Sequence, residues 1–149
     1  MATTKVTWEG DKVKEHIASR LHSAMRESVL LVEGAAKKLA PVDTGQLRSS
    51  IASHIEGGSK SSQIEGVVYS NAEYAPHVEF GTEPHKKAVG SDEFITSVTD
   101  WCRRHGIKDP YPIIRKIRRS GTKAQPFLIP ALHQNQNRIQ AIFNARMAV

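Results

Sequence analysis

The chain has 149 residues, of which 39% are hydrophobic and 6% aromatic, and its formal net charge is +6. Its length predicts a single domain, residues 1–149, and its one cysteine, Cys102, excludes an intrachain disulfide framework and favours a reducing compartment. No apolar run approaches the roughly 18 residues of a membrane span, and residues 1–10 lack the apolar core of a signal peptide, so we expect a soluble protein made in the cytoplasm without membrane contact.

The charge is divided unevenly along the chain. Residues 1–100 carry 11 Lys and Arg against 14 Asp and Glu, whereas residues 101–149 carry 10 Lys and Arg and one acid, Asp109. This favours a polyanionic or acidic partner for the C-terminal part, with a solvated basic face as the plainer alternative. The low aromatic content suits a protein stabilised by neighbours in an assembly, although a small monomer with long polar loops fits equally well.

A long helix is predicted from Asp11 to about Ala40, after a short lead-in with one strand turn around Val6 and Trp8. Apolar residues recur at spacings of three and four along one face. They are Val13, Ile17, Leu21, Ala24, Met25, Leu31, Val32, Ala35, Ala36 and Leu39. Pro41 ends the helix, because its ring disfavours helical geometry at the preceding residue.

A turn and two strands are predicted next. Asp43 and Gly45 are typical turn residues, and the alternation from Leu47 to Ile55 predicts a strand with one buried face. A Gly- and Ser-rich loop over residues 56–62 leads to a second strand, Gln63–Ser70, so the two form an antiparallel hairpin.

Four shorter helices are predicted after the hairpin. The first is capped by Asn71 and ends at Gly81, with Tyr74, Val78 and Phe80 packed towards the long helix. The second covers Asp92 to about His105, and the third opens at Asp109 and Pro110 and ends at Gly121. Both of these helices lie within residues 84–124. The last helix, residues 130–149, begins at Pro130, and its sparse apolar stripe of Ile139, Ile142 and Phe143 lacks an obvious partner.

The sequence gives no sign of catalysis, a metal site or a cofactor. Phosphate-binding glycine loops and a nucleophile elbow are missing. Cys102 lies within a helix without an assigned base. The group His77, Glu79, Glu83 and His85 straddles a Gly–Thr break instead of sharing a helix face. We expect Glu79 to pair with backbone amides or an arginine, for which Arg48 is a candidate.

Three segments rich in proline, glycine and apolar residues occur in order along the chain. The first, residues 40–51, contains Pro41, Asp43, Thr44, Gly45, Leu47 and Arg48. The second, residues 74–82, contains Tyr74, Val78, Glu79, Phe80, Gly81 and Thr82. The third, residues 125–132, contains Pro126, Phe127, Leu128 and Pro130. Each is interpreted as a structural joint between elements.

This ordered set, behind a long N-terminal helix, resembles the tail-completion or neck proteins of long-tailed double-stranded DNA phages. These are relatives of gene product ten of the Hong Kong lambda-like phage, with the minor tail protein Z of phage lambda as a distant cousin. The resemblance implies an α+β fold, with a small antiparallel sheet packed on the long helix and further C-terminal helices. It also implies a virion protein without enzyme activity, in which residues 84–124 are a helical insert relative to the compact members of the family.

As partners, the resemblance implies further copies of the chain in a ring of six at the head–tail junction or the head-proximal end of the tail. Neighbouring neck, connector, tail-terminator or tail-tube proteins would bind that ring, and double-stranded DNA would pass through it. Two other classes remain open: a stand-alone basic nucleic-acid-binding domain, and a small hydrolase suggested only by scattered histidines.

The third predicted helix carries Arg115, Lys116, Arg118 and Arg119 around an apolar side of Ile113, Ile114 and Ile117. We expect these four cations to line a channel or face DNA, because phosphate contact is independent of sequence. The opposing interpretation is a salt-bridged interface with an acidic protein surface.

Overall fold

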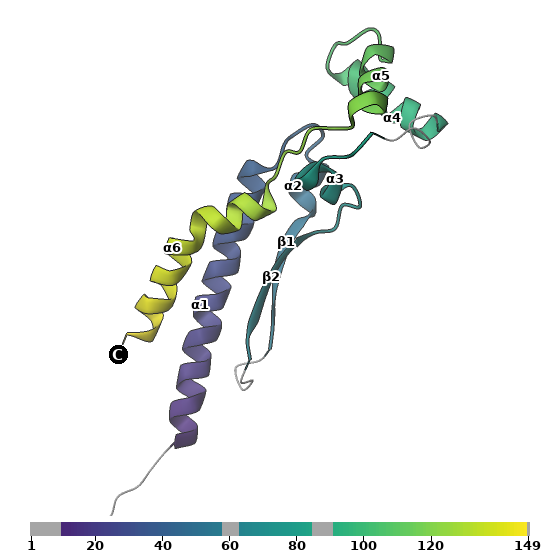
Figure 1. The fold of residues 1–149 in the computed structure, drawn as a ribbon. Helices are drawn as coiled ribbons and strands as arrows, with labels where there is room; N and C mark the ends of the chain where they lie inside the picture. The colour runs from purple at the N-terminus through teal and green to yellow at the C-terminus, as the bar shows by residue number, and fades with distance from the viewer. Residues whose placement is uncertain (1–9, 58–62, 85–90, 149) are drawn as a thin grey trace, which may run out of the picture. The chain divides into compact units, whose positions relative to one another are not determined.

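The computed structural model describes residues 10–57, 63–84 and 91–148. The strand predicted at Val6 and Trp8, and most of the Gly- and Ser-rich loop, lie outside these ranges. Within them the chain has a long N-terminal helix, a two-stranded antiparallel sheet and further helices towards the C-terminus, which confirms the predicted α+β class (Figure 1). Backbone contacts divide the chain into two compact units. Unit 1 comprises residues 1–72 and 127–149, and unit 2 comprises residues 73–126.

The long helix α1 (Gly10–Leu39) is the spine of unit 1. Helix α6 (Leu128–Met147) runs antiparallel beside it (Figure 1). Arg146 donates a hydrogen bond of 2.9 Å to Glu27, and Arg20 donates one of 3.2 Å to the carbonyl oxygen of Ala148. The C-terminal end of α6 is therefore held against the middle of α1.

The apolar stripe of α1 is buried only from its second half onwards. Ala24, Val32 and Ala36 are buried, whereas Val13 and Ile17 are exposed. At 1.5 Å per residue α1 is about 45 Å long and α6 only about 30 Å, so α6 cannot cover all of α1. The apolar face predicted for α1 is therefore left uncovered over its first two turns.

Between α1 and the hairpin, the strand predicted over Leu47–Ile55 is wrong at its start. Gln46–Ser50 form a short helix, α2, and strand β1 covers Ile51–Glu56. The hydroxyl groups of Ser49 and Ser50 donate to carbonyl oxygens three residues earlier, which favours a helical turn. Leu47 and Ile51 fit either interpretation, because they are spaced for one helical turn and also share a strand face.

Strand β2 (Glu65–Ser70) pairs with β1 so that Ile51 lies opposite Ser70 and Glu56 opposite Glu65. Gly66 brings β2 close to α1, since a Cβ atom there would lie 2.4 Å from the Cγ1 atom of Val29. One face of the hairpin therefore packs on α1. This confirms the predicted antiparallel pair.

The described residues of unit 2 form three helices, α3 (Ala75–Phe80), α4 (Asp92–Arg104) and α5 (Tyr111–Ser120). Ser91 caps α4 by accepting a hydrogen bond from the backbone of Phe94, and Asp109 accepts one from the backbone of Tyr111 at the start of α5. Both helices lie where they were predicted. Helix α3 begins at Ala75 without a side-chain cap, so the predicted cap at Asn71 is wrong.

Among the described helices of both units, none is long and apolar enough to cross a membrane.

Helix α6 begins two residues before the predicted start at Pro130. Pro130 is tolerated at its third position, because the first backbone N–H groups of a helix have no partner within it.

Glu33 ties α1 to the hairpin through charge-assisted hydrogen bonds. Its carboxylate accepts one bond of 2.6 Å from Lys37 and another of 2.5 Å from the hydroxyl of Ser53 in β1. These hydrogen bonds, that of Lys37 first, lower the pKa of Glu33 below its usual 4.5. Folding therefore favours the ionised carboxylate.

We predict that Glu33→Gln lowers the free energy of unfolding by about 1–2 kcal/mol at neutral pH, because two bonds lose their charged acceptor. A lowered pKa stabilises the fold above the pKa of the unfolded chain, and this stabilisation is lost as pH falls through the folded value. Thermal unfolding across a pH series should show a constant difference above about pH 5 that shrinks in acid. Glu15→Gln, at an exposed position of the same helix, is the control, and an equal loss there would contradict the assignment.

Candidate functional site

The second segment, residues 74–82, is closed by backbone contacts with residues 121–125. Thr82 donates its backbone N–H to the carbonyl oxygen of Thr122 at 3.1 Å, and the two hydroxyl oxygens lie 2.9 Å apart. Gln125 donates to the carbonyl oxygen of Val78 at 2.8 Å. Within unit 2, the chain before α4 is therefore held by hydrogen bonds to the chain after α5.

Two glycines allow this close approach of the chains. Gly81 and Gly121 have φ values of 74° and 69°, in the left-handed region that favours glycine. A Cβ atom on Gly81 would lie 2.6 Å from the carbonyl oxygen of Thr122, and one on Gly121 would overlap that of Thr82. Gly81 thus allows the two backbones to approach each other and also ends α3.

The side chains of the second segment are arranged differently from the prediction. Glu79 is buried with only 5% of its surface exposed, whereas Phe80 is 69% exposed. Ala75 and Glu79, four residues apart, share the inner face of α3, and Phe80 is one residue further around the helix. The prediction that Phe80 is a core residue is therefore wrong.

Glu79 has an interaction partner, as a buried carboxylate requires. Its predicted partner Arg48 is exposed and belongs to unit 1, so this pairing stays a prediction. Tyr74 is also partly exposed, and Val78 is half-buried.

The first segment connects α1 to α2 and the hairpin, and the third segment leads from the end of unit 2 into α6. Gly45 adopts a φ of 85° directly before α2, and Leu47 is buried. Pro41 lies directly behind α1, and the exposed residues Asp43, Thr44 and Arg48 occupy the turn and α2. In the third segment Phe127 and Ala131 are fully buried and Leu128 is half-buried, whereas Pro126, the last residue of unit 2, is exposed.

The basic helix α5 has the predicted distribution of side chains. Ile114 is buried, and Ile113 and Ile117 are half-buried. The cations project from the remaining surface, and all four are exposed: Arg115, Lys116, Arg118 and Arg119. This surface can contact an anionic partner without breaking the packing of the helix.

Neither the thiol nor the histidines form a recognisable reactive centre in the described part of the chain. Cys102 is a free thiol with 1% of its surface exposed. No group of three His, Cys, Asp or Glu residues that could hold a metal ion occurs among the described residues, and His85 lies outside them. The absence of enzyme activity stays a prediction.

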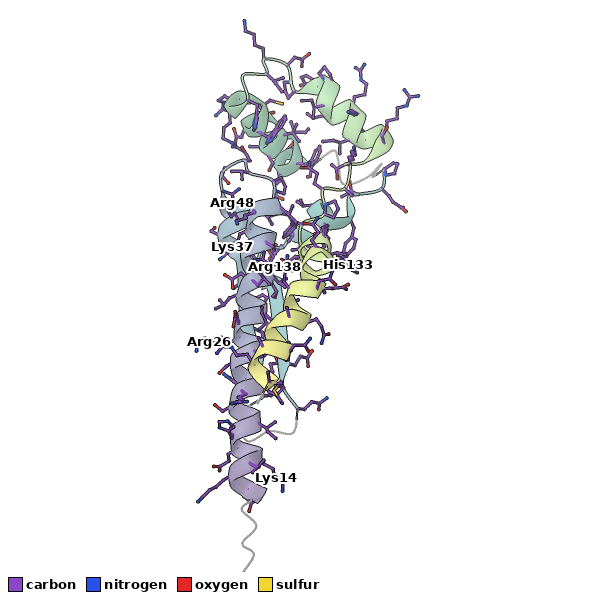
Figure 2. The ribbon with its side chains drawn as sticks, turned by 90° about the vertical axis from the view of Figure 1, so that its left-hand side faces the viewer. Lys14, Arg26, Lys37, Arg48, His133 and Arg138 are labelled. Carbon is purple, nitrogen blue, oxygen red and sulfur yellow. The ribbon has the colours of Figure 1, made fainter. Side chains whose placement is uncertain are left out.

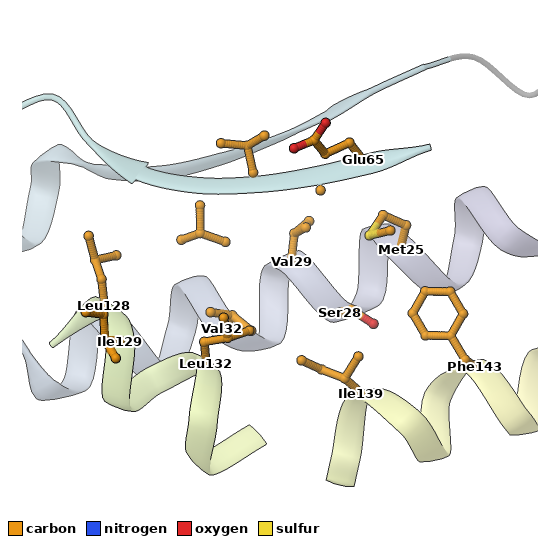
Figure 3. Close-up of a pocket in the computed structure, with 13 residues that line it drawn as sticks. Met25, Ser28, Val29, Val32, Glu65, Leu128, Ile129, Leu132, Ile139 and Phe143 are labelled. Carbon is orange, nitrogen blue, oxygen red and sulfur yellow. The ribbon is translucent and has the colours of Figure 1, made fainter. Parts of the chain in front are cut away.

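An apolar groove in unit 1 was not predicted from the sequence. It has a volume of about 480 Å³ and lies along α1, with β2 on one side and α6 on the other (Figure 3). The wall from α6 includes Leu132 together with Ile139 and Phe143, two residues of the stripe for which the sequence showed no partner. Of the described residues that line the groove, Glu65 alone is charged. Such a groove fits an apolar segment of another polypeptide.

Comparison with known proteins confirms the predicted family. Residues 9–81 match the family model described as "Bacteriophage HK97-gp10, putative tail-component". The match spans α1, the hairpin and α3, and contains the first of the three segments and all of the second except Thr82. Over these residues the chain belongs to the HK97 gp10-like family. No curated protein and no solved structure matches the chain.

Sequence reasoning overlooked the groove and the exposure of Phe80 for different reasons. The groove depends on the angle at which α6 and β2 meet α1, which periodicity does not encode. A signal for Phe80 was present, because Glu79 and Phe80 are adjacent on a short helix and cannot share one face. The prediction instead placed every aromatic residue of the segment in the core.

The two phenylalanines provide a matched test. Phe80→Ala should change the melting temperature little, because the ring is already exposed, whereas Phe127→Ala should cost about 3–5 kcal/mol, because its ring is fully buried. Chemical denaturation of both variants measures the difference. Equal losses of stability would show that Phe80 is packed in solution.

Proposed function

We propose that the chain is a structural virion protein of a long-tailed double-stranded DNA phage. In this proposal it forms a closed ring at the head–tail junction or the head-proximal end of the tail, where it completes the tail and lets DNA pass. The observation that carries the proposal is the match of residues 9–81 to a family of phage tail components. Its place in the virion would be the neck or the upper end of the tail.

The open groove supports assembly into a ring. A lone chain leaves apolar residues of α6 and β2 in contact with water, including Leu132 at 48% exposure. Burying such surface against a neighbour is favourable by about 25 cal/mol per Å². A heterologous contact of this kind closes into a ring when its rotation allows.

The basic helix α5 supports contact with passing DNA. Four exposed cations on one helix suit phosphate oxygens, and such contacts carry no base specificity, which a DNA passage requires. Neighbouring neck or tail proteins with acidic surfaces are the competing partners of the same helix.

Assembly is tested by mass photometry of the purified protein and of isolated tails that carry it. We expect a closed oligomer of about six copies in at least one setting, since the contact can close. Immunogold labelling should place the protein at the head-proximal end of the tail. A monomer in solution that is also missing from particles would contradict the proposal.

The role of α5 is tested by reversing Arg118 and Arg119 to Glu together. If α5 faces DNA, rings and joined particles should form but retain or eject DNA abnormally, because the reversed charges repel phosphate. The matched control is Arg118→Lys with Arg119→Lys, which keeps the charges and should behave as wild type. Failure of head–tail joining, with normal DNA in the particles that do form, would instead identify α5 as a protein interface. DNA binding without any virion association would favour a stand-alone nucleic-acid-binding domain.

A further inference from the structure

Unit 1 has two different faces, one on each side of its hairpin. The β2 side carries the apolar groove. The β1 side carries a smaller hollow of about 260 Å³, lined by α1 and β1. Leu30, which lines this hollow, is 55% exposed. Arg26 lies one helical turn before Leu30 and projects from α1 on the side away from α6 (Figure 2).

Both edges of the hairpin are open within the described residues, because its sheet has only two strands. Asn71 donates its backbone N–H to the carbonyl oxygen of Ser50, which fixes the alternation of bonded pairs along the register. In that alternation Ser53 in β1 and Val68 in β2 direct their backbone groups outwards. Open apolar strand edges of this kind pair readily with another chain.

We infer that the β1 side of one copy docks onto the β2 side of the next. The β1 edge of the second copy extends the sheet of the first, and Leu30 of that copy enters the groove beside Leu132. This inference rests on the proposed function, because it specifies the contact from which the ring is built.

The spacing of the elements allows both contacts at once. Two strands per copy, each about 4.8 Å from the next, repeat every ~9.6 Å. Packed helices lie about 8–10 Å apart. Shifting one copy by this distance relative to the next therefore pairs the strands and also places α1 of the second copy over the groove of the first.

The charges of the two faces are complementary. Glu65 is the charged residue of the groove, close to Met25, since both line it. In the docked pair, Arg26 of the second copy faces the groove of the first copy. It lies at the level of Met25, because Met25 and Arg26 are adjacent in sequence. Neither Arg26 nor Glu65 forms an ion pair within the described residues. Docking brings the two together.

The two faces differ, so the contact is heterologous and leaves one free face at each end of a growing row of copies. Such rows close into rings when the rotation per copy divides a full turn. A two-fold dimer would instead bury the same face on both copies.

The experiment is a charge swap between the two faces, with assembly followed by mass photometry and by the yield of infectious particles. Arg26→Glu and Glu65→Arg should each reduce the fraction of assembled rings at least several-fold, because each places like charges together. The double variant, which restores opposite charges, should regain most of the assembly. Both positions are exposed, so circular dichroism should show an unchanged fold.

The matched control is Lys38→Glu, which makes the same charge change at an exposed position of the same helix. Assembly should be unaffected by it. Rings that form normally with either single reversal would overturn the docking inference and leave the proposed function standing. A wild-type protein that neither assembles nor joins particles would remove the proposed function itself.

Cysteine cross-linking measures the direction of the contact. Leu30→Cys combined with Leu132→Cys should give a ladder of disulfide-linked oligomers after mild oxidation, whereas either change alone should give none. Wild type controls for Cys102, which is buried. A dimer band from Leu30→Cys alone would indicate a two-fold contact and overturn the head-to-tail arrangement.

Discussion

The fold of unit 1 depends on one helix that serves two partners. One face of the second half of α1 is buried because the hairpin packs on one side and α6 on the other. The buried positions of α1 are small or β-branched, such as Ala24, Val29 and Ala36, which lets both partners approach closely. Because the hairpin and α6 pack on one narrow stripe of α1, a gap remains between them, and that gap is the apolar groove.

Polar contacts link both of these partners to α1. Glu33 holds β1 against α1 through Ser53, and Arg146 holds α6 through Glu27. Glu33 is partly shielded, and hydrogen bonds from Lys37 and then from Ser53 lower its pKa, whereas the second contact is exposed, and exposed ion pairs contribute little free energy. The register of α6 therefore rests chiefly on packing around Phe127 and Ala131, which are fully buried.

Unit 2 shows how a helical segment is held with few constraints. Its two ends are fastened between Thr82 and Thr122, and Gly81 and Gly121 let the backbones meet there. The helices between these ends need only an apolar side for each other, so the outer surface of α5 is free to carry cations. The groove and the basic helix thus lie in different units. The proposed contact between copies and the proposed contact with DNA can then be altered independently.

The sequence by itself determined the family, the fold class, and the positions of α1, α4 and α5, because periodicity, caps and proline or glycine stops are local signals. It also determined that Ile114 faces inwards and Arg118 outwards, since α5 is strongly amphipathic. Tertiary structure decided the rest. Leu47 became helical because local serine bonds competed with strand pairing, Phe80 faced water because Glu79 took the inner side of α3, and Val13 was left uncovered because α6 is shorter than α1. The groove exists only in the packed structure, since its walls come from segments about a hundred residues apart in sequence.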